Sequence, residues 1–288
     1  MTDGLLNSAG IGLRLAHLAE IVATRPSTGW LEVHPENFMA NPHAAELLTE
    51  LSTQYPISLH TVGISIGSAS GIDRLHLARL RGLAGKLNPL FVSGHLAWSA
   101  NGADYLNDLL PLPYTDEALR VVVAHLAEVQ DVLGCSYLVE NPATYVGFSS
   151  STMTETEFLS EMVRRTGCQL LCDVSNVVVS AHNMAFDPVG YINDFPADAV
   201  GEIHLGGYTP EEDESTSGAE LWIDAHASAI SQSSWDLYDY AIRRFGPRPT
   251  LIEWDNIIPP LATLLSEAGY ADRIEKAARL EVRCADAC

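Results

Sequence analysis

Short apolar segments recur along the chain, and longer amphipathic stretches separate them. Eight of these segments have the length of strands and are apolar on both faces, as the strands of a buried parallel sheet are. We expect strands at Ile11–Arg14, Trp30–His34, Ile57–His60, Leu90–His95, Tyr137–Glu140, Gln169–Asp173, Val200–His204 and Thr250–Glu253.

Between the strands, apolar positions repeat at helical spacing. The stretches concerned are Pro42–Gln54, Asp73–Leu87, Asp116–Leu133, Glu155–Thr166 and Ser234–Phe245. Asn41 precedes Pro42 and is a good N-cap for the first of these helices. Because strands and helices alternate throughout, we expect one α/β domain over residues 1–288, a (β/α)8 TIM barrel, with a flexible tail at about 281–288.

Long connections are expected after four strands, at Gly63–Gly71, Ser99–Pro113, Val174–Phe186 and Gly206–Glu220. In such barrels the segments that follow the strands build the active site at the C-terminal rim.

The chain has 288 residues and a net charge of −21. A negative field of this size repels phosphate backbones, so we expect no nucleic acid as a partner. No apolar run is long enough for a membrane span, and the N-terminus lacks the pattern of a secretory signal, so we expect a cytoplasmic protein. Cys135, Cys168 and Cys172 are expected in the core, and Cys284 and Cys288 in the tail.

The predicted strands share a chemical feature, because most of them end in a side chain that binds metals. These residues are His60, His95, Glu140, Asp173, His204 and Glu253. Asp224 and His226 in "DAH" project from one face of an extended segment, and Asn176 follows Asp173 by three positions. Imidazole and carboxylate donors suit zinc, iron or manganese, so we expect a polynuclear metal site at the rim.

Other polar residues are also expected at this rim. Arg14, His17, Glu36 and Asn37 are candidates for substrate binding, with rim hydrogen bonding as the alternative. His182 is a possible additional ligand.

At these residues the chain resembles the multinuclear non-heme iron-dependent oxidative enzymes, the MNIO family. The matching stretches are "GLRLAH", "EVHPENF", "SLH", "SGHLAW", "LVENP", "LCDVSNVVVSA", "GEIHLGGY", "IDAH" and "TLIEWDNIIP". The resemblance implies a TIM barrel with two or three iron ions, Fe(II) and Fe(III) together, and O2 as co-substrate. It implies oxidation of cysteine residues in a ribosomally synthesised precursor peptide, which a separate partner protein presents.

The resemblance also implies roles for individual residues. His60 and His95 would hold one iron, and Glu140 would bridge to the next. Asp173, His204 and Glu253 would complete the second site, and Asn176, Asp224 and His226 would hold the third. The chain departs from the family in Tyr208, where many members have His, and in "AHNMAFD", where an Asn-His-Gly run is commoner.

Two alternatives remain open on the sequence. Endonuclease IV-like and xylose isomerase-like metal enzymes share the barrel, and the trinuclear zinc endonucleases have almost the same ligand order. The net charge of −21 and Asn176, at a position where a His is expected, count against the endonucleases. A non-catalytic metal-binding protein would instead have a coordinatively closed site.

Overall fold

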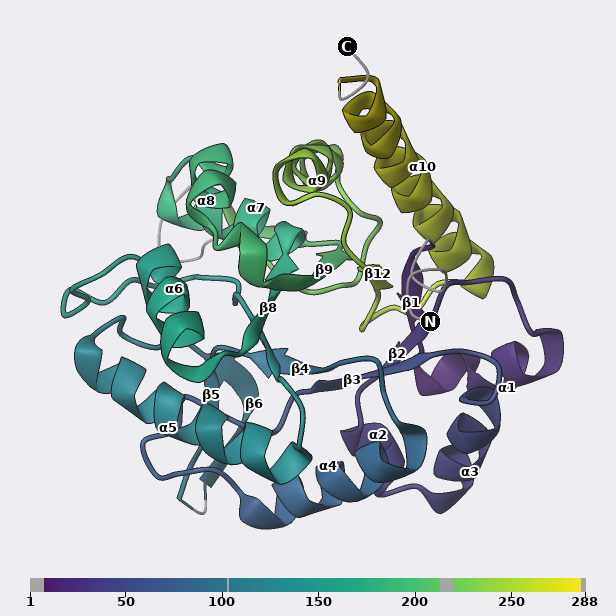
Figure 1. Ribbon diagram of the computed structural model, residues 1–288, viewed down its shortest axis with the longest axis horizontal. Coiled ribbons are helices and arrows are strands. Elements are labelled where there is room, and N and C mark those ends of the chain that lie inside the picture. The colour runs from purple at the N-terminus through teal and green to yellow at the C-terminus, as the bar shows by residue number, and fades with distance from the viewer. Residues whose placement is uncertain (1–7, 103, 213–219, 286–288) are drawn as a thin grey trace.

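In the computed structural model, eight parallel strands close into a barrel (Figure 1). The structure describes residues 8–102, 104–212 and 220–285. Around the barrel the strands follow the order β1-β12-β9-β8-β7-β4-β3-β2. Their bounds are β1 Gly10–Gly12, β2 Leu31–Val33, β3 Ile57–Thr61, β4 Val92–His95, β7 Leu138–Glu140, β8 Gln169–Asp173, β9 Val200–Gly206 and β12 Thr250–Glu253. Each coincides with one of the eight predicted segments to within two residues, so the predicted TIM barrel is confirmed.

Helices surround the barrel. They are α1 Leu15–Thr24, α2 Glu36–Met39, α3 Pro42–Leu51, α4 Arg74–Leu87, α5 Asp116–Leu133, α6 Glu155–Thr166, α7 Val174–Met184, α8 Pro188–Asp194, α9 Gln232–Phe245 and α10 Leu261–Ala285, with a 3-10 turn at Ala197–Ala199. The predicted cap is present in α3, where the Asn41 side chain accepts a hydrogen bond from the Ala44 amide. No helix in the described part of the chain is long and apolar enough to cross a membrane.

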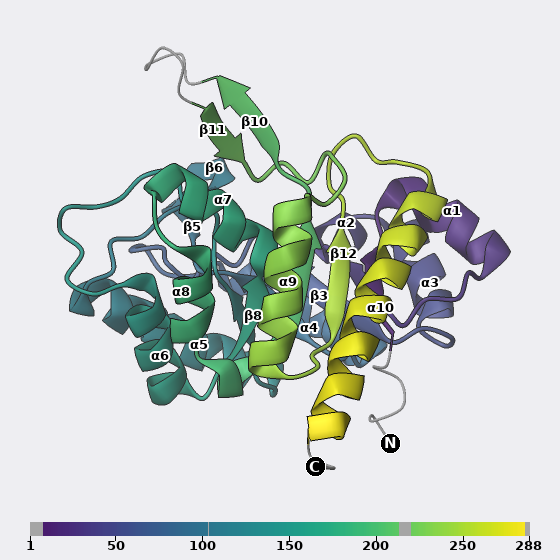
Figure 2. The ribbon, with the colours of Figure 1, turned by 90° about the horizontal axis from the view of Figure 1, so that it is seen from above.

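Two hairpins lie in the long connections. β5 (Trp98–Asn101) pairs with β6 (Asp104–Leu110), and β10 (Thr209–Glu212) pairs with β11 (Glu220–Ile223), both antiparallel. The β10–β11 hairpin projects beyond the C-terminal rim of the barrel (Figure 2). The prediction of a loop at Val174–Phe186 is wrong, because most of this segment is helix α7. Its residues are buried from Val174 to Ala181, so they carry no amphipathic period that would reveal a helix.

Residues 281–285 of the expected tail continue helix α10, which runs from Leu261 to Ala285. The buried positions of α10 are Leu261, Leu264, Ala268, Ala271, Glu275 and Ala278, spaced three and four apart. Half of them are alanine, which weakens the apolar signal. Cys288 lies outside the described residues, and Cys135, expected in the core, is exposed.

Candidate metal centre

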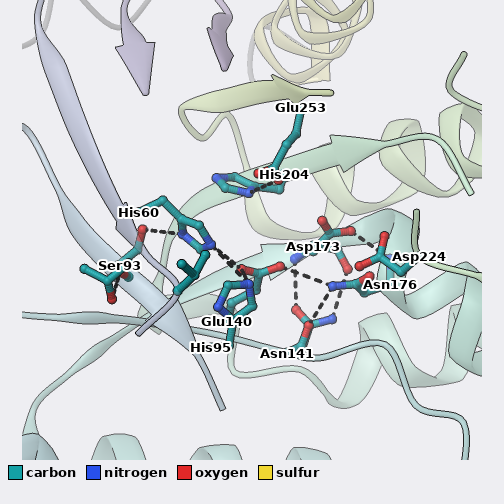
Figure 3. A network of polar contacts seen from close by, with 12 residues as sticks. His60, Ser93, His95, Glu140, Asn141, Asp173, Asn176, His204, Asp224 and Glu253 are labelled. Atoms are coloured by element: carbon teal, nitrogen blue, oxygen red, sulfur yellow. Dashed lines mark hydrogen bonds and ion pairs between the residues drawn. The ribbon is translucent and has the colours of Figure 1, made fainter. Parts of the chain in front are cut away.

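Side chains from several barrel strands converge at the C-terminal rim (Figure 3). Their nitrogen and oxygen atoms form overlapping groups in which all donor atoms lie within 4.8 Å of one another. Three of these groups are His60–His95–Glu140, Glu140–Asp173–His204 and Asp173–His226–Glu253. Because Glu140 and Asp173 each belong to two groups, the groups form one continuous cluster.

The first group contains two imidazoles directed at one carboxylate. His60 Nε2 lies 3.2 Å from His95 Nε2 and 3.2 Å from Glu140 Oε2, and the His95 nitrogen lies 3.4 Å from the same oxygen. The Ser93 hydroxyl contacts the other ring nitrogen of His60 at 2.8 Å. Burial lowers the pKa of His60 and brings that of His95 to about 4, which keeps both rings neutral. Both therefore offer lone pairs to a cation.

In the second group, each carboxylate uses one oxygen for the scaffold and leaves the other free. Asp173 caps α7 by accepting the Asn176 amide at 2.7 Å, and its Oδ2 has no hydrogen-bond partner. Glu140 accepts from Asn176 Nδ2 at 3.2 Å, and its Oε2 is likewise without a hydrogen-bond partner. Burial raises the pKa of Glu140, and burial together with Asp224 raises the pKa of Asp173 to about 7.

The third group lies below the β10–β11 hairpin. Asp224 Oδ1 is 2.6 Å from His226 Nε2, and the other ring nitrogen of His226 lies 3.1 Å from Asp255 Oδ2. His226 has a left-handed backbone with φ 44°. It packs on Gly206, where an added Cβ would lie 2.4 Å from the imidazole ring. A non-glycine left-handed residue is uncommon and is found preferentially at functional sites.

The donors present suit bound metal ions. Buried atoms without a hydrogen-bond partner include Glu140 Oε2, Asp173 Oδ2 and Asn176 Oδ1, and these atoms belong to the side chains of the cluster. Leaving such atoms unsatisfied is costly, and a cation would satisfy them. Nitrogen and oxygen donors without thiolate are typical of iron, manganese or zinc sites.

The four residues expected to bind substrate lie in different surroundings. Arg14 is buried, with its Nη2 2.8 Å from Glu253 Oε1, and it also pairs with Asp255. His17 is buried in α1, 2.7 Å from the Pro259 carbonyl. Glu36 and Asn37 lie in α2 and are more open, and Glu36 borders a cavity of about 480 Å³.

His182 and Tyr208 lie outside the donor groups. Both rings stack on Trp222, with centroid distances of 3.8 Å for His182 and 4.4 Å for Tyr208. His182 Nε2 contacts the Glu220 carbonyl at 3.1 Å. Both residues therefore contribute to the packing of the β10–β11 hairpin.

Sequence reasoning missed several polar residues of the cluster. They are Glu32, Ser93, Asn141, Glu202 and Asp255. Three of them could have been found, because Glu32, Glu202 and Asp255 each lie two positions from a rim residue of the same strand or its extension. Side chains two apart in a strand point to the same face.

Comparison with known proteins decides the family. The model of the family described as "RiPP precursor modification enzyme MbnB/TglH/ChrH" matches residues 8–276. The chain belongs to this family. The resemblance found in the sequence is thus confirmed, and the family modifies precursors of ribosomally synthesised and post-translationally modified peptides.

Relatives match most of the chain, and solved structures share its fold. A UPF0276 protein of Vibrio parahaemolyticus is 49% identical over 91% of this chain and 90% of its own length. A UPF0276 protein of Rhizobium meliloti is 46% identical over 94% of this chain and 87% of its own length. A D-tagatose 3-epimerase-like protein has a TM-score of 0.62 at 14% identity, with 96% of this chain and 99% of that one covered. A xylose isomerase-like TIM barrel protein of Mycobacterium smegmatis has a TM-score of 0.61 at 12% identity, with 94% of this chain and 97% of that one covered. At these identities the structures show the barrel fold alone.

Proposed function

We propose that the chain is an iron- and O2-dependent oxidoreductase that modifies cysteine residues of a ribosomally synthesised precursor peptide. The observation that carries the proposal is the cluster of overlapping donor groups in a member of a peptide-modifying family. Iron bound there would supply the redox chemistry, taking electrons from the cysteine and passing them to O2. A redox-inert ion such as zinc could not supply it.

The chain's own residues would divide the work of holding the ions. His60 and His95 would serve one ion, with Glu140 shared with the next. Asp173, His204 and Glu253 would hold that second ion, and Asn176, Asp224 and His226 a third. The free Glu140 Oε2 between the two imidazoles supports its part in the first group.

We propose that the peptide approaches from the rim, where Glu36 and Asn37 can contact it. Glu36 is fixed there by the Gly63 amide at 3.0 Å and by His76 at 3.0 Å. Arg14 and His17 are buried and contact Glu253 and the Pro259 carbonyl, respectively. These contacts favour a role in positioning neighbouring residues rather than in binding the peptide. We further propose that a partner protein presents the peptide, for example by pairing strands, and that the reaction takes place in the cytoplasm without nucleic acid.

Co-expression with the neighbouring peptide and partner genes tests this function. We expect the protein, purified without air from iron-replete cells, to contain two to three iron ions. In air, the peptide should lose mass in an amount that corresponds to oxidation. An unchanged peptide mass with iron and partner present would contradict the proposal. Stoichiometric zinc together with cleavage of abasic DNA would favour the endonuclease alternative, and a metal-loaded protein inert toward both would favour a binding protein.

A further inference from the structure

Two carboxylates of the cluster lie one layer deeper in the barrel than the strand-end ligands, and one of them, Glu32, forms a donor group with His60 and His204. Glu32 in β2 and Glu202 in β9 are both 0% exposed. Glu202 precedes His204 by two residues in its strand, so its side chain points inward one layer further from the rim. Among the residues that the structure describes, His204 is the salt-bridge partner of both. Buried carboxylates are costly without a partner, so their position calls for an explanation.

The two carboxylates converge on a single nitrogen. Glu202 Oε1 lies 3.2 Å from His204 Nε2, and Glu32 Oε1 lies 3.3 Å from the same atom. The Ser58 hydroxyl donates to the other oxygen of Glu32 at 2.8 Å, which fixes the orientation of that carboxylate. The opposite ring nitrogen, His204 Nδ1, faces Glu253 Oε2 at 3.0 Å, as Figure 3 shows from the side.

The tautomer of His204 follows from these contacts. A neutral imidazole has one N–H and one lone pair, and a metal ion takes the lone pair. Carboxylates face both ring nitrogens, but Glu253 at Nδ1 belongs to the proposed metal site. With the metal bound there, the ionised carboxylates of Glu32 and Glu202 at Nε2 only accept, so they retain the proton on that nitrogen. The lone pair is then on Nδ1, which faces the rim carboxylate. His60 shows the opposite arrangement, because Ser93 occupies its Nδ1 and Nε2 faces the cluster.

We propose that Glu32 and Glu202 are positioning residues that hold the Nε2–H of His204 and so direct its Nδ1 to the metal. The inference rests on the metal centre of the proposed function. Carboxylates behind a ligating histidine fix its ring and raise its basicity, and their removal typically lowers metal affinity about 10–100-fold.

The tautomer can be measured directly with diamagnetic Zn(II) as the probe. In protein labelled with 15N-histidine, long-range proton–nitrogen correlation distinguishes a metal-bound nitrogen from a protonated one. The His204 signals are assigned by their loss in a His204→Asn variant. We expect a metal-bound Nδ1 and a protonated Nε2. Zinc on Nε2 would overturn the proposal.

Variants test the two carboxylates. Glu32→Gln and Glu202→Gln should each lower Zn(II) affinity about tenfold or more, while the melting temperature of the metal-free protein does not fall. Glu275→Gln is the control, because Glu275 is also buried but lies in α10 and pairs with Arg279. It should leave Zn(II) affinity unchanged. A lower melting temperature with unchanged Zn(II) affinity in the Glu32 and Glu202 variants would show a merely structural role and overturn the proposal.

Ser58→Ala provides a milder change if a glutamine variant does not fold. It removes the donor that orients Glu32 and should lower Zn(II) affinity by a smaller factor; unchanged affinity would count against the proposal. The result that would overturn this inference differs from the result that would overturn the proposed function. Peptide oxidation by the iron-loaded protein, together with zinc on His204 Nε2 in the zinc-loaded protein, overturns this inference alone. A correct His204 tautomer with no peptide oxidation overturns the proposed function alone.

Discussion

At the scale of single residues, side chains of the metal centre use one polar atom to bond the surrounding protein. They leave a second polar atom directed at the other donors of the cluster. Asp173 caps α7 with Oδ1 and leaves Oδ2 free. His60 is held at Nδ1 by Ser93 and presents Nε2 to Glu140. Ordering each ligand in advance lowers the entropy lost when a metal binds. The donor atoms of the cluster are thus already arranged to bind metal ions.

Glu140 should matter for more than one metal ion, because it belongs to two of the donor groups. We expect Glu140→Gln to lose at least two ions and all peptide oxidation. Asp224→Asn should lose mainly the third ion, since Asp224 contacts His226 alone among the histidines of the cluster described. Elemental analysis of both purified variants checks this. Retention of full metal content by Glu140→Gln would show that the assignment of Glu140 is wrong.

Metal binding should depend on pH. Burial raises the pKa of Asp173 to about 7, so in the metal-free protein a proton competes with the metal below that pH. Metal affinity should therefore rise from about pH 5.5 to about pH 7, by about tenfold per pH unit for the proton that Asp173 releases. Competition with a chelator of known pH dependence measures it. An affinity that stays constant across this range would contradict the expectation.

At the scale of elements, helix α7 anchors strand β11, which leads into Asp224 and His226. The Asn183 side chain bonds both backbone groups of Trp222, accepting from its amide at 3.0 Å and donating to its carbonyl at 2.9 Å. The His182 ring stacks on the Trp222 ring, and the Asp224 amide donates to the Tyr145 hydroxyl at 3.0 Å. The hairpin therefore determines where the third group of donors lies.

Loosening this anchor should affect the third ion selectively. Asn183→Ala removes both hydrogen bonds to Trp222, and we expect the loss of about one ion from a fully loaded protein while the other groups retain theirs. Asn193→Ala is the matched control, because Asn193 accepts from the Tyr240 hydroxyl on α9, away from the hairpin. Metal counts after gel filtration distinguish the two. Equal metal content in both variants would show that β11 holds its position without Asn183.

At the scale of the whole molecule, the barrel closes through close contacts between neighbouring strands. Gly94 in β4 allows Thr61 of β3 and Tyr137 before β7 to meet, with their hydroxyl oxygens 2.7 Å apart. A Cβ at Gly94 would lie 2.2 Å from the Tyr137 hydroxyl and 2.8 Å from the Thr61 carbonyl. Since His95 follows directly, barrel closure and the first donor group depend on the same glycine.

Gly94→Ala should lower the free energy of unfolding by about 1–3 kcal/mol, because backbone and side chains must move to admit the methyl group. Gly85→Ala is its control. Gly85 lies in α4, where an added Cβ would meet no atom within 4 Å beyond the neighbouring backbone of its own helix, and alanine there should raise the free energy of unfolding by about 0.5–1 kcal/mol. Denaturant titration measures both. Equal effects of the two substitutions would contradict the packing argument.

The sequence by itself determined the eight strands, the barrel and the residues at the strand ends. Apolar runs and side-chain alternation are local properties, and a parallel barrel brings the carboxyl ends of all its strands to one rim. For that reason the order of residues along the chain was enough to place His60, Glu140 and His204 together. The sequence also determined the family, through motifs spread from Gly12 to Pro260.

Only the tertiary structure decided which atoms face which. Glu32 and Glu202 come from strands far apart in the chain, and their convergence on one nitrogen of His204 depends on barrel closure. Helix α7 was hidden because burial on every side removes the helical period. The sequence pattern did not predict helix α10, because alanine, at half of its buried positions, carries little apolar signal. Local patterns report which residues are buried, but the partner of a buried polar group is set by contacts between distant segments.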